Sequence, residues 1–191
     1  FIGFESVNDT SLKSVNKKNS VARYETLVHA IHSRGIMINA SLVFGLDGDG
    51  PDVFRNTLDW LIKHKIETMT AHILTPYPGT KLFGQMEEQG RIVCKDLSKY
   101  NTANVVFSPK RMQAQELYAG YLWVYKSFYS FRNIMRRRPE NRAQRKPYFI
   151  FNLFYRKFGG LTSALAHIIP MQVLGKLAIW VSYRKKEKAQ P

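Results

Sequence analysis

The feature that most constrains this fold is an alternation of short apolar runs with helix-like segments over residues 1–90. The runs FIGFES (1–6), IMINASLVF (36–44) and ETMTAHIL (67–74) have the length and composition of buried strands. Each run is followed by a turn of small or polar residues and then by a segment with apolar residues at helical spacing. This alternation is typical of parallel βαβ units. The sequence therefore predicts an α/β fold with a parallel sheet.

Three helices are expected to alternate with these strands. Ser20 can cap the first helix and Gly35 can end it. Pro51 suits the first position of the second helix, and Gly90 closes a short third one. Apolar residues at helical spacing predict the buried faces of the first two helices: Val21, Tyr24, Leu27, Val28 and Ile31, and then Phe54, Leu58, Leu61 and Ile62.

Three parallel strands alone would leave an exposed edge, which complete domains normally avoid. NVVFSP (104–109) is a candidate for one more extended segment. The chain also starts directly on an apolar run at Phe1, with no initiator Met and no targeting signal. We therefore expect a partial (β/α) barrel, a half of three or four parallel strands, whose partner is the upstream half of the same polypeptide.

Basic residues are concentrated in the second part of the 191-residue chain. Residues 1–109 carry 12 basic and 11 acidic side chains, whereas residues 110–191 carry 17 basic and 3 acidic ones. The pattern predicts a long helix from Gln113 to Met135, followed by a basic, polar linker over 136–147. Strongly apolar stretches follow at 148–158 and 161–183.

The predicted organisation has three parts. Residues 1–108 form the half barrel, and residues 109–138 form the long helix packed on it. Residues 139–191 form a basic and apolar helical extension that completes the α-helical C-terminal part of the fold.

Three interpretations of the tail remain open, in decreasing order of preference. It packs on the other half of the enzyme, it binds the inner face of a membrane as a peripheral element, or it binds nucleic acid. Pro170, Gly175 and Lys176 argue against a simple transmembrane helix in 161–183. A cytoplasmic protein, peripheral to the membrane under the second interpretation, is expected.

The single cysteine excludes several kinds of site in this chain. Cys94 cannot form an intramolecular disulfide, a Cys-rich zinc site or a three-cysteine cluster site, and we interpret it as a packed residue. The five histidines lack the company of metal ligands and are interpreted as structural, with His72 the one that faces the barrel. No metal site and no catalytic acid or base is predicted.

Candidate binding residues gather where the predicted strands end, because ligands of parallel α/β folds bind at the carboxyl ends of the strands. Those ends are Glu5–Ser6, Gly45–Asp49 and Thr75–Thr80. They offer glycines that let a ligand approach the backbone, carboxylates for hydroxyl or ammonium groups, and apolar neighbours for a flat base. The alternative is that GLDGDG (45–50) is only a tight turn between strand and helix.

An ordered set of segments bears on that choice, and its most distinctive piece is TPYPGT (75–80). The set comprises FIGFES, SLKSVNKKNS (11–20), GIMINASLVFGLDGDG (35–50), HILTPYPGTKLF (72–83) and EEQGRI (87–92). It resembles the second half of the barrel in radical S-adenosylmethionine enzymes, above all the class with an N-terminal cobalamin-binding domain, over residues 1–130.

The resemblance implies S-adenosylmethionine bound on a 4Fe–4S cluster, cleavage to a 5′-deoxyadenosyl radical, and methyl transfer to carbon or oxidative ring closure. It implies lipid or tetrapyrrole substrates, with cobalamin held by an upstream domain. Residue by residue, it assigns contacts with the ribose or the amino-acid part of S-adenosylmethionine to Glu5 and Ser6. It assigns the surface for the adenine ring to Val43, Gly45, Leu74 and Thr75. It also places Asn39 and Asp47 at the mouth of the same site.

Two departures from the family pattern qualify that expectation. The turn GLDGDG has Asp49 where the family often has Glu, and the three-cysteine motif is absent from the chain. The cluster ligands must therefore lie outside it, and this part alone is expected to be inactive. The alternatives are a methylthiotransferase-like member, which the helical tail disfavours, and a non-catalytic basic module for lipid or RNA.

Overall fold

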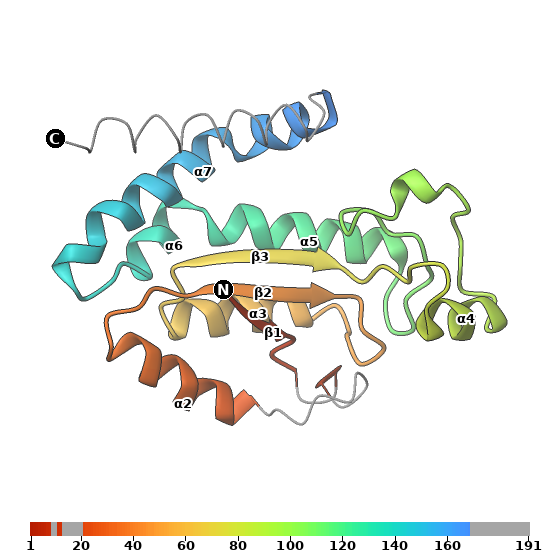
Figure 1. The fold of residues 1–191 in the computed structure, drawn as a ribbon, viewed down its shortest axis with the longest axis horizontal. Coiled ribbons are helices and arrows are strands. Elements are labelled where there is room, and N and C mark those ends of the chain that lie inside the picture. Colours follow the sequence, from red (N-terminus) through yellow and green to blue (C-terminus); the bar gives the residue numbers. More distant parts are fainter. Residues whose placement is uncertain (9–10, 13–20, 169–191) are drawn as a thin grey trace, which may run out of the picture. The chain divides into compact units, whose positions relative to one another are not determined.

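The computed structural model describes residues 1–8, 11–12 and 21–168, and side chains as far as Phe158 (Figure 1). The chain divides into two compact units, Phe1–Asn152 and Leu153–Pro191, and the sheet with its covering helices belongs to the first. The elements, in chain order, are β1 (Ile2–Glu5), α2 (Val21–His32), β2 (Asn39–Phe44), α3 (Val53–Lys63), β3 (Thr68–Ile73), α4 (Lys81–Glu88), η1 (Leu97–Lys99), α5 (Ala114–Phe128), α6 (Phe131–Arg136) and α7 (Arg142–Ile168).

The three strands form one parallel sheet in the order β1-β2-β3 (Figure 1). Asn39 pairs with Thr68 at one end of the β2–β3 ladder and Phe44 with Ile73 at the other. All three carboxyl ends therefore lie at one edge of the sheet. The predicted α/β class, a partial parallel sheet followed by helices, is confirmed.

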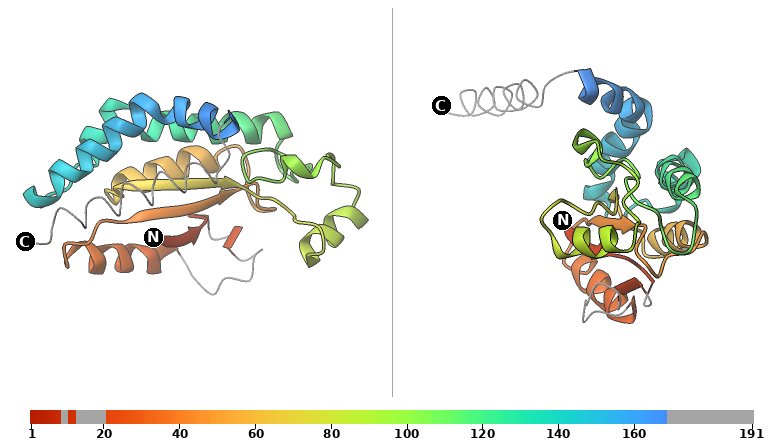
Figure 2. Two further views of the ribbon diagram at one scale, coloured as in Figure 1. Left: turned by 45° about the horizontal axis from the view of Figure 1, so that its top comes forward. Right: turned by 90° about the vertical axis from the view of Figure 1, so that its right-hand side faces the viewer.

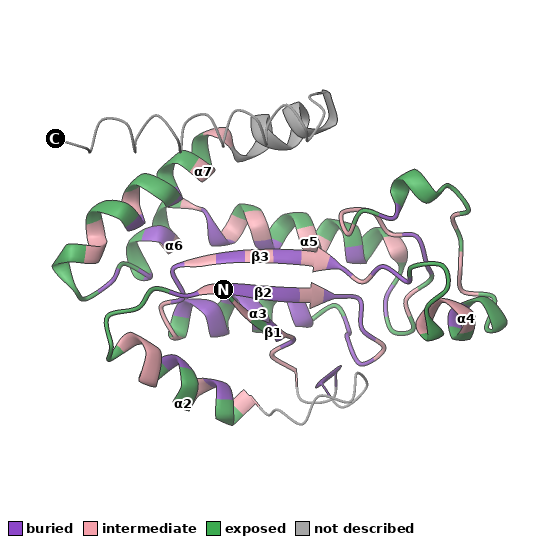
Figure 3. Ribbon diagram, viewed as in Figure 1, coloured by how far each residue is buried: buried purple, intermediate pink, exposed green. Residues whose placement is uncertain are grey.

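One face of the sheet packs against α2 and α3, and α5 lies beside α3 along β3 (Figure 2). The Phe4 ring contacts Tyr24 of α2 and Trp60 of α3, and the Phe44 ring contacts Phe54 of α3. The strand residues directed to these helices are buried, as the purple bands of β2 and β3 show in Figure 3: Phe4, Ala40, Leu42, Phe44, Met69, Ala71 and Ile73. Burial of this apolar layer stabilises the half barrel.

The outer edge of β3 is closed by side chains of the helical segment, not by another strand. The Tyr125 hydroxyl accepts from the Ala71 N–H at 2.8 Å and donates to the Ala71 carbonyl at 3.1 Å. Tyr129 does the same for Met69, at 3.4 and 3.1 Å. Because these hydroxyls satisfy the edge groups, the exposed parallel edge expected from the sequence is not present at β3.

The single helix expected from Gln113 to Met135 is two helices, α5 and α6. The chain leaves the helical path at Ser130, which has an extended conformation and accepts the Asn133 N–H on its hydroxyl, as an N-cap does. Gln113 and Glu116 form a capping box at the start of α5. Helices nevertheless occupy most of residues 114–168, so the expectation of a helical tail is confirmed.

The stretch 136–147 is not a simple polar linker, because Arg137 is fully buried. Its guanidinium donates to the carbonyls of Ile66 at 2.7 Å, Glu67 at 3.0 Å and Phe128 at 2.8 Å. It also lies 3.4 Å from the centre of the Phe128 ring. Arg137 therefore joins the start of β3 to the end of α5, and the linker interpretation is wrong at this residue.

The boundaries 1–108, 109–138 and 139–191 stay a prediction. The expected cap Ser20 lies outside the described residues, as does most of the apolar stretch 161–183. Within residues 1–8, 11–12 and 21–168, no helix combines the length and the apolarity needed to cross a bilayer.

Candidate functional site

The candidate site is the edge where the three parallel strands end. β1 ends at Glu5, which lies in the left-handed region with φ of 64°, directly after an irregularity in the β1–β2 register between Gly3 and Glu5. Left-handed backbone in a residue other than glycine is strained, and such strain clusters at functional sites. The half-buried Glu5 side chain is thus placed by an unusual backbone conformation at the strand end.

Ser6 follows Glu5 and is buried. Its N–H donates to the Phe4 carbonyl at 2.8 Å, and its hydroxyl accepts the Asn8 N–H at 3.1 Å. The Ser6 hydroxyl therefore organises the turn after β1.

The loop after β2 is organised by Asp49, whose buried carboxylate accepts the backbone N–H groups of Gly45 and Leu46, both at 3.0 Å. The same carboxylate accepts the Ser11 hydroxyl, which ties this loop to the segment after β1. Burial raises the pKa of Asp49, although these hydrogen bonds oppose the effect. Asp49 therefore holds the loop in shape.

Glycine is required at two positions of that loop. Gly45 has φ of 94°, and a Cβ there would lie 2.8 Å from a methyl group of Leu117. A Cβ on Gly48 would lie 2.9 Å from the Ser11 backbone nitrogen. The loop therefore runs close to two other segments, which fixes the backbone at the end of β2.

Asp47 is held from outside the loop by cations distant in sequence. Arg91 lies 2.8 Å and Lys110 2.7 Å from its carboxylate. Partial burial raises the pKa of Asp47, but the hydrogen bonds and charges of Lys110 and Arg91 outweigh it, so the net effect lowers the pKa. Arg111 also donates to the Gly48 carbonyl at 3.1 Å. These three basic residues were not predicted from the sequence, because nothing local links them to the loop.

The end of β3 lies beside the end of β2. The Leu74 N–H donates to the Phe44 carbonyl at 2.9 Å, which extends the ladder by one residue. The buried Thr75 donates its hydroxyl to the Ile73 carbonyl at 3.1 Å. The half-buried side chain of Leu74 stays partly accessible at this edge.

The uncovered face of the sheet is mostly polar. Alternate residues of the two paired strands lie on it, in register: Asn39 with Thr68, Ser41 with Thr70, and Val43 with His72. Thr70 donates to the Asn39 side-chain oxygen at 3.3 Å. The His72 ring lies 3.1 Å from the hydroxyl of Thr102, a residue with φ of 63°. Thr70 and His72 can be assigned to this face from the sequence, because apolar and more polar residues alternate over 68–73.

Seven of the eight predicted residues are near the carboxyl edge, and Asn39 is not. Asn39 is the first residue of β2, about 17 Å of extended strand away from Phe44. It lies on the same uncovered face as Val43 but at the opposite end of the sheet. The expectation that Asn39 and Asp47 share one mouth therefore does not match their positions.

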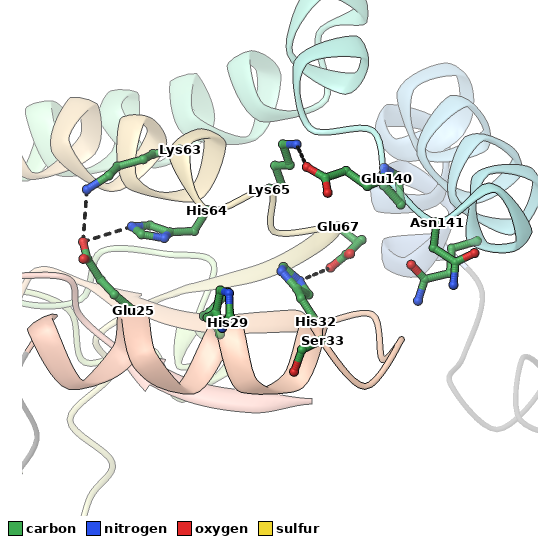
Figure 4. Close-up of a pocket in the computed structure, with 13 residues that line it drawn as sticks. Glu25, His29, His32, Ser33, Lys63, His64, Lys65, Glu67, Glu140 and Asn141 are labelled. Atoms are coloured by element: carbon green, nitrogen blue, oxygen red, sulfur yellow. Dashed lines mark hydrogen bonds and ion pairs between the residues drawn. The ribbon is translucent and has the colours of Figure 1, made fainter.

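A second feature lies at the amino ends of the strands, where a pocket of about 370 Å³ opens between α2, α3 and the segment before α7 (Figure 4). His64 and Lys63 lie 3.1 and 3.2 Å from Glu25, and His32 lies 3.2 Å from the buried Glu67. Paired charges of both signs line the pocket. Among the described residues no group of three or more His, Cys, Asp or Glu could hold a metal ion.

Comparisons with known proteins agree with the resemblance found in the sequence. The family model described as "Domain of unknown function (DUF4070)" matches residues 80–188, which is more than half of the chain. This domain is found in cobalamin-binding radical S-adenosylmethionine enzymes, so the predicted recognition is confirmed.

Curated relatives are similar to this chain over half of its length or more. The chain is 34% identical to the bacteriochlorophyllide d C-12(1)-methyltransferase of Chlorobaculum tepidum over 82% of its own length and 34% of the relative's. It is 26% identical to the anaerobic magnesium-protoporphyrin IX monomethyl ester cyclase of Cereibacter sphaeroides, over 67% and 21%. It is 28% identical to the hopanoid C-2 methylase of Rhodopseudomonas palustris, over 53% and 19%. The chain thus spans about a third or less of the length of these relatives.

Proposed function

This chain belongs to the DUF4070 family, and from that premise we propose that it is part of a radical S-adenosylmethionine enzyme that methylates carbon or closes a ring by oxidation. The observation that carries the proposal is the 34% identity to a methyltransferase over 82% of this chain, an extent that includes strands of the sheet as well as helices of the tail. One stretch of chain thus supplies both the candidate site and the helices that hold it.

The carboxyl edge of the sheet fits S-adenosylmethionine. The carboxylate of Glu5 suits ribose hydroxyls or the ammonium group, and the partly accessible Val43 and Leu74 side chains suit the adenine ring. Gly45, held by Asp49, packs against the Leu117 and Phe107 side chains and so fixes the end of β2 beside the proposed nucleoside site. Ser6 and Thr75 are buried supports of the two outer loops and would position the ligand-contacting residues.

The iron–sulfur cluster does not fit this chain by itself. A 4Fe–4S cluster of this family takes three cysteine ligands, and Cys94 is the chain's one cysteine. Its sulfur lies 3.9 Å from the Asp96 carbonyl, after the last strand. The cluster ligands therefore come from another part of the polypeptide. The cluster with bound S-adenosylmethionine supplies a hydrogen-abstracting radical, and the residues at the carboxyl edge of the sheet orient the nucleoside.

The proposed substrate is a tetrapyrrole or a polycyclic lipid. The names of the relatives describe action on bacteriochlorophyllide d, on a magnesium-protoporphyrin ester and on a hopanoid. All of these are large, mainly apolar molecules, whereas the uncovered face beyond the nucleoside site carries the half-buried Thr70 and His72. We propose that these polar groups contact the oxygen-bearing rim of a tetrapyrrole. Use of cobalamin, held by an upstream domain, is part of the same proposal.

The proposed location is the cytoplasmic side of the membrane, with peripheral attachment. Apolar substrates of this size partition into membranes, and the tail of the chain is basic, with 17 Lys and Arg against 3 acidic residues over 110–191. An enzyme held at the membrane surface would meet such substrates directly.

The test uses the full-length protein, reconstituted without oxygen with iron, sulfide, cobalamin and S-adenosylmethionine, with dithionite as the one-electron reductant. The expected result is formation of 5′-deoxyadenosine, with a tetrapyrrole substrate that gains a methyl group or a ring. Glu5→Gln is expected to weaken binding of S-adenosylmethionine at least tenfold, while Glu88→Gln, at an exposed position at the end of α4, leaves it unchanged. Failure to cleave S-adenosylmethionine in the reconstituted protein would contradict the proposal.

A further inference from the structure

The helices α6 and α7 are fixed to the half barrel along one side only. The buried Tyr148 donates its hydroxyl to the Ile134 carbonyl at 2.7 Å, which joins α7 to α6. The buried Asn152 donates to the Glu67 carbonyl at 3.2 Å, at the start of β3. Tyr148 and Asn152 are four residues apart and therefore share one side of α7. This side faces the protein core.

The outward side of the same two helices carries large apolar residues. Phe131 and Met135 lie one turn apart on α6 and are 55% and 37% exposed. Ile150 and Phe151 of α7 are 62% and 50% exposed, between the two buried positions of that helix. In Figure 3, green marks exposed residues along α6 and the first turns of α7. Exposed apolar residues gathered on adjacent elements indicate an interaction surface.

Positive side chains lie on the same two helices and on the segment that joins them. Residues 131–152 carry seven Lys and Arg and a single acidic residue, Glu140, which is paired with Lys65 at 2.5 Å. Arg137 is buried, and Arg145 donates to the Pro139 and Glu140 carbonyls. The other five basic residues are exposed: Arg132, Arg136, Arg138, Arg142 and Lys146.

We infer that this α6–α7 surface, formed by those five basic residues together with Phe131, Met135, Ile150 and Phe151, docks on an anionic lipid bilayer. The inference deepens the location part of the proposed function and rests on it. The guanidinium and ammonium groups bind lipid phosphates, while the apolar side chains enter the boundary between headgroups and acyl chains. The long aliphatic parts of the Arg and Lys side chains let these charged groups reach the phosphates from beside the apolar residues.

Two other occupants suit this surface less well. A protein interface is depleted of charge at its centre, whereas here exposed positive side chains outnumber exposed apolar ones. A single-stranded nucleic acid could stack bases on Phe131 and Phe151, but it would leave the aliphatic side chains of Ile150, the most exposed apolar residue of the set, and Met135 without a partner. A bilayer satisfies both the charges and the aliphatic side chains.

The experiment measures cosedimentation of the full chain with phosphatidylcholine vesicles, with and without about 30 mol% phosphatidylglycerol. Binding is expected only to the anionic vesicles, and it should weaken as salt is raised. The double variant Ile150→Glu/Phe151→Glu should bind at least tenfold more weakly. Arg132→Gln/Arg138→Gln/Arg142→Gln should lose about a hundredfold, since each charge near the surface contributes about fivefold.

The control is Leu97→Glu, which adds one negative charge at a position that is 64% exposed and outside the α6–α7 surface. It should cost no more than a few-fold. Unchanged vesicle binding by Ile150→Glu/Phe151→Glu would overturn the inference, since another segment would then be the anchor. Equal binding to neutral vesicles would overturn it too, as would tighter binding to a single-stranded RNA oligonucleotide than to anionic vesicles.

The same variants separate this inference from the proposed chemistry. In the full-length enzyme with detergent-dispersed substrate, Ile150→Glu/Phe151→Glu should cleave S-adenosylmethionine at the unaltered rate, because neither residue lies at the carboxyl edge of the sheet. If vesicle binding fails while cleavage persists, the docking surface is refuted alone. If vesicles are bound but no cleavage occurs, the chemistry is refuted and the surface stands.

Discussion

Replacement of Arg137 by alanine should lower the free energy of unfolding by about 4 kcal/mol. Burial lowers the pKa of Arg137 from 12.5 to about 10, because its charged form is desolvated. Its three hydrogen bonds of 3.0 Å or less, to the carbonyls of Ile66, Glu67 and Phe128, each contribute about 1.5–3 kcal/mol after that desolvation is counted. The lower end of their sum, about 4–5 kcal/mol, is expected because water can reach the freed carbonyls in the alanine variant.

Urea denaturation of the full chain, followed by circular dichroism, measures this loss. Arg138→Ala is the matched control, because the Arg138 side chain is next in the sequence but exposed. This substitution should lower the free energy of unfolding by less than about 0.5 kcal/mol. Arg137→Lys should fall between the two, since an ammonium group keeps the charge but cannot reach the carbonyls at the end of α5 and the start of β3 together. A loss below about 1 kcal/mol for Arg137→Ala would refute the reasoning that this side chain joins the two elements.

Three further changes test the packing and the charges. Gly120→Ala should cost about 1–3 kcal/mol, seen as a lower Tm, because the new Cβ would lie 2.2 Å from the Phe54 ring. Tyr125→Phe should cost about 1–3 kcal/mol and speed hydrogen exchange of the Ala71 amide, which loses its partner at the β3 edge. His64 has a pKa lowered by burial, although the Glu25 carboxylate opposes this. The unfolded chain therefore takes up the proton first, so stability should fall as pH drops below about 6.5, and His64→Gln should flatten that dependence in urea midpoints measured across pH.

Each of these changes has a control in the same chain. Gly84→Ala, in α4 with no atom within 4 Å of the new Cβ, should be neutral or slightly stabilising. Tyr118→Phe alters an exposed tyrosine of the same helix as Tyr125 and should leave the Ala71 amide unaffected. His29→Gln alters an exposed histidine of the same pocket. If a control matched its test variant, the local explanation for that variant would be wrong.

The strands were predictable because each is a short apolar run with a polar end, but their limits depend on partners. The second run begins at Ile36, yet β2 begins at Asn39, where pairing with Thr68 starts. Ile36 is 54% exposed, since it precedes the ladder. The break between α5 and α6 was missed for a related reason. Ser130 interrupts the helix because its hydroxyl accepts the Asn133 N–H and so caps the start of α6. The apolar residues on both sides of Ser130 make the sequence look like one continuous helix.

The candidate site was predictable in outline but not in its supports. Strand ends and glycines are local features, so Glu5 and Gly45 could be identified from short segments. The partners of Asp47 could not, because Arg91 and Lys110 lie 44 and 63 residues further along the chain and look like any surface cation. The position of Asn39 was misjudged because a residue's place along a strand decides which end of the sheet it occupies.

The run of three arginines at 136–138 shows why the tail has to be tested by point substitutions. The sequence alone does not distinguish these three arginines, yet Arg137 is buried against the start of β3 while Arg136 and Arg138 are exposed. Removal of the chain after residue 135 would delete Arg137, Tyr148 and Asn152, and with them the hydrogen bonds at the start of β3. Loss of S-adenosylmethionine binding in such a truncation would therefore reflect a loosened sheet. Single exposed arginines can be replaced without that damage, so they separate surface binding from the integrity of the half barrel.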